Sequence, residues 1–406
     1  MHLLRRPRLA FLFAGGALNE IGSWATLIAL WGFSSYHFHA GPGAIAEIGL
    51  AWTVPAAALS VVSGWPIDRF GPRATLAAAN LAGMATALAM AAAGSFGALA
   101  ALAAAAGAVR AFGEPAAASL PPRLVGDADL LAANSLMSMT QQLAIVCGPL
   151  VAALSITLWG LRAAFLVDAA TFVAGTAALA PLRLRPVDGG VHASHAGDVL
   201  AGVRLAWRNV TVRRTLALAL AVFASWGCFM VLEPLYVRDV LHRSPAVLGY
   251  LQTSYGVGLL ATTAALPRIG DRVASLRVLA ASVAVSGLAA AVYVGTSRLA
   301  VAVAGVFLWG VATGFFLPPM RTLLQRSTPT RNHGRVMATV GAVNGIAGLA
   351  TIPASGVIVG VVGVRATGAA VGACLLACGA AGLAARSPVL QDPPANSASS
   401  AAATAG

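Results

Sequence analysis

Apolar stretches of about 20 residues or more follow one another along the whole chain, separated by short polar segments. This is the length that an α-helix needs to cross the hydrocarbon core of a bilayer. The one-residue alternation typical of a membrane β-barrel is absent from the sequence. Because lipid offers the backbone no hydrogen-bond partners, the stretches must be helices. The pattern predicts an all-α membrane protein with twelve spans, at about 9–36, 44–65, 74–95, 97–120, 129–157, 161–182, 214–237, 245–267, 274–296, 298–322, 333–361 and 365–386.

Composition and charge agree with a membrane protein and indicate how it is oriented in the membrane. Of the 406 residues, 58% are hydrophobic and only 10% are charged, against about 25% charged in a soluble domain. All 26 basic residues are arginines; twenty fall on the side of the N-terminus, five on the other side, and Arg110 lies inside a span. The positive-inside rule then places both termini in the cytoplasm, in the cytoplasmic membrane of the cell. The net charge of +13 is expected to face anionic lipid rather than nucleic acid.

The segments at the ends and in the middle define the domain organisation. The N-terminus has arginines before an apolar run, as in a signal peptide, but the run continues to about Phe38, so we expect a retained first helix. Residues 183–213 interleave valines and leucines with arginines, which suits an amphipathic helix on the membrane surface. We therefore expect a bundle at 1–182, a linker at 183–213, a second bundle at 214–386 and a disordered tail at 387–406.

The two predicted bundles share sequence features at an offset of 203 or 204 residues. These are Asp68-Arg69 with Asp271-Arg272, Pro115 with Pro319, and Pro149 with Pro353. A nearly constant offset indicates internal duplication, six helices plus six. Two pseudo-symmetric halves around an axis normal to the membrane, with a central site between them, are an architecture of transporters.

A polar loop, GWPIDRFGPR, interrupts the apolar pattern between spans two and three. Its glycines permit a tight turn, and its acid could complement the dipole of a neighbouring helix. The loop resembles the signature of the major facilitator superfamily, which implies a gate latch made by Gly64, Asp68, Arg69, Gly71 and Arg73. The second copy keeps Asp271 and Arg272 but has Ala274 and Leu276 at the positions of Gly71 and Arg73. The alternative is a basic loop that only sets topology.

Span five has small residues at the spacing of the antiporter motif of that superfamily, at Ser135, Ala144, Gly148, Pro149 and Ala152. Small residues let helices pack closely, and proline kinks a helix, although a kinked helix can occur in any bundle. Three further stretches, 114–136, 163–172 and 321–339, are similar to the drug-efflux branch related to macrolide and siderophore exporters. The resemblance covers essentially the whole chain.

Ionisable residues within spans point to function, because they are costly in lipid. Glu20 lies about 18 Å beyond Arg8 along the first helix, near the midplane, and is the candidate for taking up and releasing a proton. The alternative is a structural acid. Arg110 and Glu114 share a face of span four, expected near the Asp68–Arg73 loop, as members of the latch network or as a structural ion pair.

Two further acids are more ambiguous. Glu233, near the outer end of span seven, is either an outer-gate acid that takes part in proton coupling or the partner of Arg238, and we favour the second. Asp168, near the start of span six, is expected to fix a helix end rather than to bind cargo.

Polar and aromatic residues at mid-depth are the candidates for cargo contacts, although each alone is more often a packing residue. They are Asn19, Trp24, Gln141, Gln142, Tyr255 and Asn344. Together they could line a mostly apolar cavity with a few polar groups, the usual form of a small-molecule site.

The sequence contains no G-x4-G-K-[ST] motif for ATP, no catalytic set and no clustered metal ligands. We therefore expect no cofactor, no bound metal and no enzymatic activity.

These features together predict a monomeric secondary transporter that exports a small amphipathic drug or metabolite by proton antiport. A facilitator or importer with the same fold remains an alternative, as does a polytopic membrane protein that acts as an enzyme or as an assembly partner.

Overall fold

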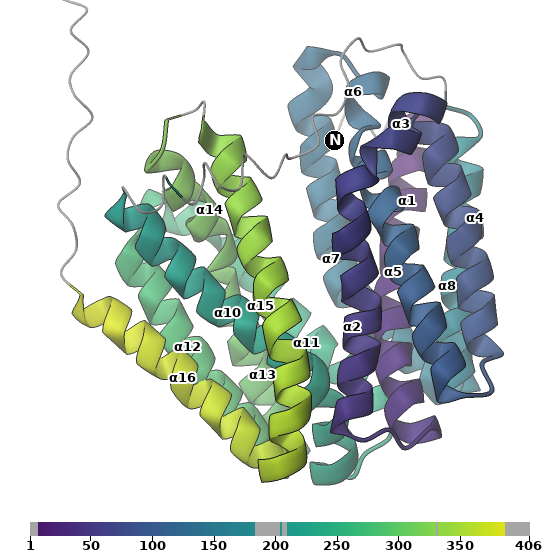
Figure 1. Cartoon of the computed structure of the whole chain (residues 1–406). Coiled ribbons are helices and arrows are strands. Elements are labelled where there is room, and N and C mark those ends of the chain that lie inside the picture. The colour runs from purple at the N-terminus through teal and green to yellow at the C-terminus, as the bar shows by residue number, and fades with distance from the viewer. Residues whose placement is uncertain (1–6, 183–203, 205–208, 330–331, 386–406) are drawn as a thin grey trace, which may run out of the picture.

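Every regular element that the structure describes is a helix. The computed structural model describes residues 7–182, 204, 209–329 and 332–385 (Figure 1). The expected C-terminal tail and most of the expected linker, 183–213, lie outside these residues, and the last residues of that linker, from Val210, form the start of a span instead. The elements that form the spans are α1 (Pro7–Gly32) with η2 (Phe33–His37), α2 (Pro42–Leu59) with η3 (Ser60–Val62), α4 (Pro72–Ala91), α5 (Phe96–Ala118), α7 (Asp127–Trp159), α8 (Leu161–Leu179), α10 (Val210–Leu235) with η4 (Tyr236–Val240), α11 (Ala246–Ile269), α12 (Leu276–Gly295), α13 (Leu299–Gly314) with α14 (Leu317–Arg326), α15 (His333–Val362) and α16 (Val364–Ala384). Short helices α3 (Gly64–Phe70), α6 (Pro121–Leu124) and η5 (Asp271–Val273) lie between spans.

The twelve predicted spans are all present as helices. Ten of them are long and apolar enough to cross a membrane on length and composition alone. The other two, α1 and α11, are 26 and 24 residues long but more polar. Both carry uncharged polar side chains in their middle, Asn19 in α1 and Gln252 in α11, and α1 also carries Glu20. These two helices therefore bring polar groups into the protein interior rather than toward lipid.

The two six-helix bundles repeat the same unusual backbone geometry. Both α1 and α10 end in a π-helical turn, η2 and η4, and each turn is followed by a histidine in the left-handed region, His39 at φ 49° and His242 at φ 50°. The hairpins α7–α8 and α15–α16 both turn at a glycine with positive φ, Gly160 and Gly363. Each pair is 203 residues apart, so the offset seen in the sequence is also an offset in structure.

Span ten departs from the prediction of one continuous helix at 298–322. It ends as α13 at Gly314 and begins again as α14 at Leu317. Pro318 and Pro319 occupy the first positions of α14, where their missing N–H groups cost no hydrogen bond. Pro115 lies inside the uninterrupted α5, so the duplicated proline has a different effect in each half.

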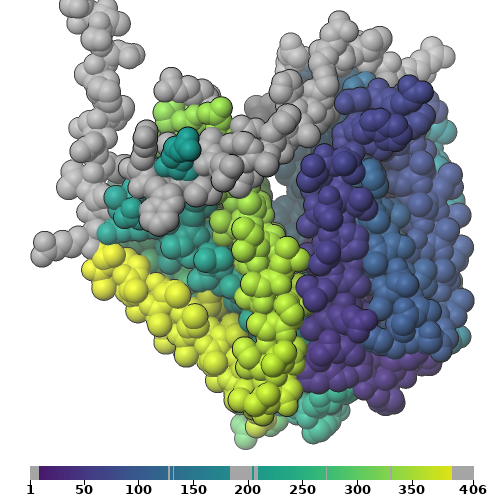
Figure 2. Space-filling model, in the orientation of Figure 1, coloured from purple at the N-terminus to yellow at the C-terminus, as the bar shows by residue number. Residues whose placement is uncertain are grey.

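The bundles meet at one end of the molecule and diverge toward the other (Figure 1). We call the meeting end the η2 end and the opposite end, which carries residues 64–73, the α3 end. Near the η2 end α7 packs on α11, and α15 packs on α2. Figure 2 shows the surfaces of α15 and α2 in contact over the lower part of the view.

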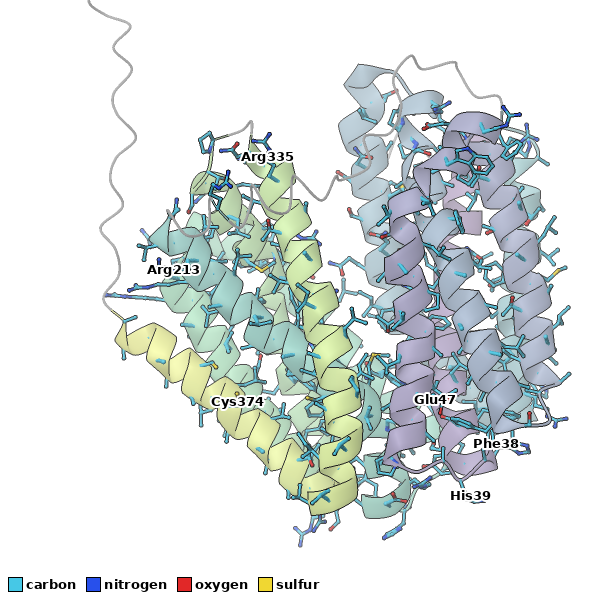
Figure 3. The ribbon with its side chains drawn as sticks, viewed as in Figure 1. Phe38, His39, Glu47, Arg213, Arg335 and Cys374 are labelled. Atoms are coloured by element: carbon cyan, nitrogen blue, oxygen red, sulfur yellow. The ribbon has the colours of Figure 1, made fainter. Side chains whose placement is uncertain are left out.

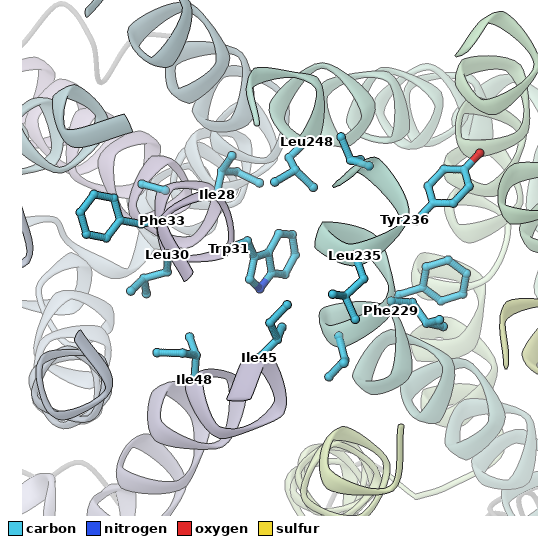
Figure 4. Close-up of a cluster of buried hydrophobic side chains, with 14 of the residues drawn as sticks. Ile28, Leu30, Trp31, Phe33, Ile45, Ile48, Phe229, Leu235, Tyr236 and Leu248 are labelled. Atoms are coloured by element: carbon cyan, nitrogen blue, oxygen red, sulfur yellow. The ribbon is translucent and has the colours of Figure 1, made fainter. Parts of the chain in front are cut away.

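Small residues bring these helix pairs close together. A Cβ at Gly249 would meet Pro149 and Ala153 of α7, and a Cβ at Gly356 would lie 2.7 Å from Ala46 of α2. An apolar cluster crosses the junction: Trp31 is 5% exposed and lies among residues of both halves, with Leu235 and Leu248 of the second half nearby (Figure 4). The η2 end is therefore closed by direct packing of one half on the other.

Candidate functional site

A cavity of about 680 Å³ lies among α1, α2, α4, α5, α7 and α8. All of its lining residues belong to the first half. Its polar and ionisable lining residues are Asn19, Glu20, Ser23, Thr26, Asn80, Thr86, Arg110, Glu114, Gln141 and Asp168, and its larger apolar ones are Trp24, Leu27, Trp52, Leu76, Met90, Val109, Met137, Ile145 and Phe172. A mostly apolar wall with a few polar groups is the usual form of a small-molecule site.

The corresponding region of the second half is occupied by aromatic rings that pack against one another. Cavity residues Thr26, Met90 and Ala106 have Phe229, Tyr293 and Trp309 as their counterparts 203 residues later. The rings of Phe229 and Trp309 lie 4.3 Å apart between centroids, and those of Phe229 and Tyr293 lie 5.9 Å apart. Larger side chains at these positions explain why the described cavity lies in one half only.

One wall of the cavity carries Glu20 and an ion pair. Arg110 donates from Nε and Nη2 to Glu114 Oε1 at 3.0 and 2.8 Å, and its guanidinium lies 5.0 Å from the ring centroid of Trp52. Both members of this pair act electrostatically on Glu20. Within the described residues the Glu20 carboxyl has no hydrogen-bond or salt-bridge partner. Glu20 therefore faces the cavity as an unpaired acid, rather than facing lipid.

Asp168 is buried in the middle of α8, so the expectation that it fixes a helix end is wrong. Its carboxylate accepts hydrogen bonds from Thr26 Oγ1 of α1 at 2.5 Å and from Thr171 Oγ1 at 3.2 Å. Gly22 of α1 packs on the same group. Asp168 thus joins α8 to α1 within the cavity wall. Sequence reasoning missed its place beside the cavity, although the rule on intramembrane acids applies to it as it does to Glu20.

The structure brings together three of the six expected cargo residues, Asn19, Trp24 and Gln141. The other three, Gln142, Tyr255 and Asn344, do not line this cavity. Tyr255 instead packs edge-on against Trp309, with 5.8 Å between ring centroids, as part of the aromatic filling of the second half. Trp52 and Phe172 are wall residues that the sequence pattern did not distinguish from other apolar residues.

Glu233 is buried away from Arg238, so the prediction that the two form a pair is wrong. Its carboxylate accepts hydrogen bonds from Tyr293 Oη, at 2.9 Å, and from Gln252 Nε2. Arg238 binds the neighbouring Asp239, from Nε to Oδ1 at 2.6 Å. Glu233 therefore belongs to the interior of the second half.

Arg238 and Tyr36 form polar links between the halves at the η2 end. Arg238 Nη1 donates to the backbone oxygens of Ser35 and Ala40 at 2.7 and 2.9 Å. In the opposite direction, Tyr36 Oη donates to the backbone oxygen of Arg243 at 2.6 Å. The links join the two duplicated π-helical turns, η2 and η4, and the segments after them.

The loop at Gly64–Arg73 is bonded within its own half. Gly71, at φ 81°, makes the turn between α3 and α4, a conformation that favours glycine. Arg73 donates to the backbone oxygens of Leu182 and Ala180, both at 2.9 Å, just past the end of α8. Among the described residues Asp68 has no partner, and Arg69 lies exposed beside it. In the corresponding loop of the second half, the glycine with positive φ is Gly270, directly before Asp271 and Arg272.

Arg110 and Glu114 pair with each other and line the cavity, as in the alternative of an ion pair, on a helix that also contacts α3.

The antiporter-type motif in α7 packs against two helices. Ala144 and Ala152 are fully buried. A Cβ at Gly148 would meet Trp24 of α1, and Pro149 is contacted by Gly249 of α11. The motif therefore lies where α7 packs against α1, whose Trp24 lines the cavity, and against α11 of the second half.

Comparison with known sequences decides the family. The profile of the Major Facilitator Superfamily matches residues 12–232 and again residues 215–405. The chain belongs to the Major Facilitator Superfamily. No curated protein sequence matches it. The double match agrees with the repeated backbone geometry of the two halves.

Solved transporters share the fold at low sequence identity. The nucleoside transporter NupG has a TM-score of 0.76 at 11% identity, covering 93% of this chain and 98% of its own. A POT family transporter in complex with 5-aminolevulinic acid has a TM-score of 0.71 at 11% identity, over 92% and 94%. A bacterial homologue of the human lysosomal transporter Spinster, in an inward-facing and unoccupied conformation, has a TM-score of 0.67 at 15% identity, over 93% and 92%.

Proposed function

We propose that this member of the superfamily is a secondary transporter that exports a small amphipathic molecule by proton antiport. The observation that carries the proposal is the 680 Å³ cavity with an unpaired Glu20 in its wall. A carboxyl group that faces a cavity within the bilayer can exchange a proton as the cavity changes sides. The similarity of 114–136, 163–172 and 321–339 to the macrolide and siderophore branch supports export.

The arginine distribution supports the orientation. Loop residues such as Arg69, Arg73 and Arg123 lie at the α3 end, and the positive-inside rule assigns that end to the cytoplasm. The structure then corresponds to an inward-facing state, closed outside by the η2 end. Rocking of the halves would open the η2 end and close the α3 end. Asp68, which has no partner among the described residues, is then available to bond across the closed α3 end, with Arg69 and Arg73 beside it.

The first experiment identifies the cargo and its coupling. Compounds retained by cells with and without the protein are compared, and the compound that is depleted is offered to everted membrane vesicles. We expect its uptake to stop when a protonophore collapses the proton gradient. Uptake that continues unchanged would show a facilitator and overturn proton antiport.

Glu20→Gln tests the coupling residue in the same vesicles. We expect gradient-driven uptake to fall at least about tenfold, or ~1.4 kcal/mol. The matched control is Glu47→Gln, which removes an exposed acid of the same half that lies outside the cavity lining, at the η2 end (Figure 3). Normal uptake by the Glu20 variant would remove this residue from the mechanism.

A further inference from the structure

The polar groups of the cavity are unevenly matched in charge. Its ionisable lining residues are three acids, Glu20, Glu114 and Asp168, and one base, Arg110. Arg110 is already engaged, by Glu114 through two hydrogen bonds and by the face of Trp52. Among the lining residues that the structure describes, no positive group other than this engaged arginine lies near the remaining acids.

Asp168 and Glu20 differ in how they are satisfied. Asp168 is 2% exposed and accepts hydrogen bonds from Thr26 and Thr171. Glu20 lines the cavity and has no partner among the described residues. Arg110 acts on Glu20 electrostatically without contacting it, so a directly bonded partner for the Glu20 carboxylate has to enter the cavity.

A second, independent observation lies one residue away. The Oδ1 atom of Asn19 is buried and has no hydrogen-bond donor. Buried polar atoms are rarely left unsatisfied, and Asn19 lines the same cavity as Glu20. Two adjacent residues of α1 therefore carry oxygen atoms without a partner among the described residues, the Glu20 carboxyl in the cavity wall and the buried Asn19 Oδ1 beside it.

The rest of the wall fits an apolar, partly aromatic body. Trp24, Trp52 and Phe172 contribute rings to the lining, and ring faces attract organic cations. We infer that the cargo is an amphipathic organic cation, whose positive charge is bound by Glu20 and whose apolar body lies against the rings. This inference rests on the proposed transport function and names the class of its substrate.

Binding of two ions of similar size and shape but opposite charge tests this class. The purified full-length protein is titrated at fixed pH, without a gradient, with tetraphenylphosphonium and with tetraphenylborate. We expect saturable binding of the cation and none of the anion. Glu20→Gln should weaken binding of the cation at least about tenfold, or ~1.4 kcal/mol. Glu20→Asp, which keeps the charge, should retain most of the affinity, and Glu47→Gln should leave it unchanged.

Equal binding of both ions, or full affinity in a folded Glu20→Gln protein, would overturn the inference. If Glu20→Gln does not fold, as judged by size-exclusion chromatography, the comparison of the two ions in the unaltered protein decides the matter. Proton-driven export of a neutral or anionic compound without binding of the cation would refute the substrate class and leave the proposed function intact. Binding of the cation without proton-driven transport would refute the proposed function and leave the cationic ligand class intact.

Discussion

Carboxyl groups at the depth of the bilayer differ in their surroundings, and these surroundings separate their roles. Glu20 faces a cavity without a partner, Asp168 is held by two threonine hydroxyls, and Glu233 is enclosed by Tyr293 and Gln252. The depth of Glu20 along α1 follows from helical rise and could be expected from the sequence, whereas the cavity that it faces is formed by packing of several helices. The hydrogen bond between Asp168 and Thr26 joins residues 142 positions apart. The residues next to Asp168 in the sequence therefore do not indicate this partner.

The Asp168–Thr26 bond gives a prediction about stability. Thr26→Val keeps the shape of the side chain but removes the hydroxyl donor, which leaves a buried carboxylate oxygen unsatisfied. We expect a loss of about 1–3 kcal/mol in the free energy of unfolding, seen as a lower melting temperature of the purified protein. The control is Thr176→Val on α8, because the Thr176 hydroxyl bonds only to a backbone oxygen of its own helix, that of Phe172. Equal melting temperatures of the two variants would show that the bond contributes no stability.

At the scale of elements, the sequence predicted which segments are helical better than how they end. All twelve spans were predicted, because long apolar runs have a single solution in lipid. The break in span ten at Phe315 and Phe316 was not predicted. A proline at the corresponding place in the first half, Pro115, lies within a continuous α5, so the proline alone does not indicate a break. The π-helical turns η2 and η4 were not predicted either, because they have no compositional signal. These turns nevertheless carry the polar links that close the η2 end.

The link made by Arg238 leads to a prediction about local opening. Arg238→Gln removes the guanidinium that reaches two backbone oxygens of the first half. We expect faster hydrogen–deuterium exchange in residues 33–43 and 236–243, because the η2 end opens more often. The control is Arg243→Gln, which removes a charge at the same end but keeps the backbone oxygen that Tyr36 binds. If both variants exchange as the unaltered protein does, these hydrogen bonds do not hold the η2 end closed.

At the scale of the whole molecule, the duplication was visible in the sequence but its asymmetry was not. The offset of 203 residues returns in the backbone at His39 and His242 and at Gly160 and Gly363. The restriction of the described cavity to the first half depends on which side chains meet across helices, for instance Phe229 with Trp309. Such encounters arise from packing, which the order of residues along one helix does not reveal. For the same reason three of the six proposed cargo residues lie outside the cavity.

The glycine contacts between the halves predict how the conformational balance can be shifted. Gly356→Val would force side-chain atoms against Ala46 and the backbone oxygen of Pro42, and overpacking of this kind costs about 1–3 kcal/mol. We expect the closed η2 end to be disfavoured. Gln141→Cys places a thiol in the cavity wall, in a protein from which the other cysteines have been removed. This thiol should then react faster with a membrane-impermeant maleimide added from the η2 side.

The matched control lies one turn further along α15. Among the described residues, no neighbour would lie within 4 Å of a Cβ at Gly360. Gly360→Val should therefore leave the labelling rate unchanged. Equal labelling of the two variants would mean that contact between α15 and α2 does not set which end is open.

The η2-end links also bear on how the protein tolerates mutation. Their acceptors are the main-chain oxygens of Ser35, Ala40 and Arg243, and every amino acid supplies such an oxygen. Side-chain replacements at these three positions therefore leave the acceptor chemistry intact. Substitutions that weaken the closure of the η2 end are therefore expected at its two donor residues, Tyr36 and Arg238. Random mutagenesis that selects for a leaky η2 end should accordingly recover changes at Tyr36 and Arg238 far more often than at the three positions whose backbone oxygens accept.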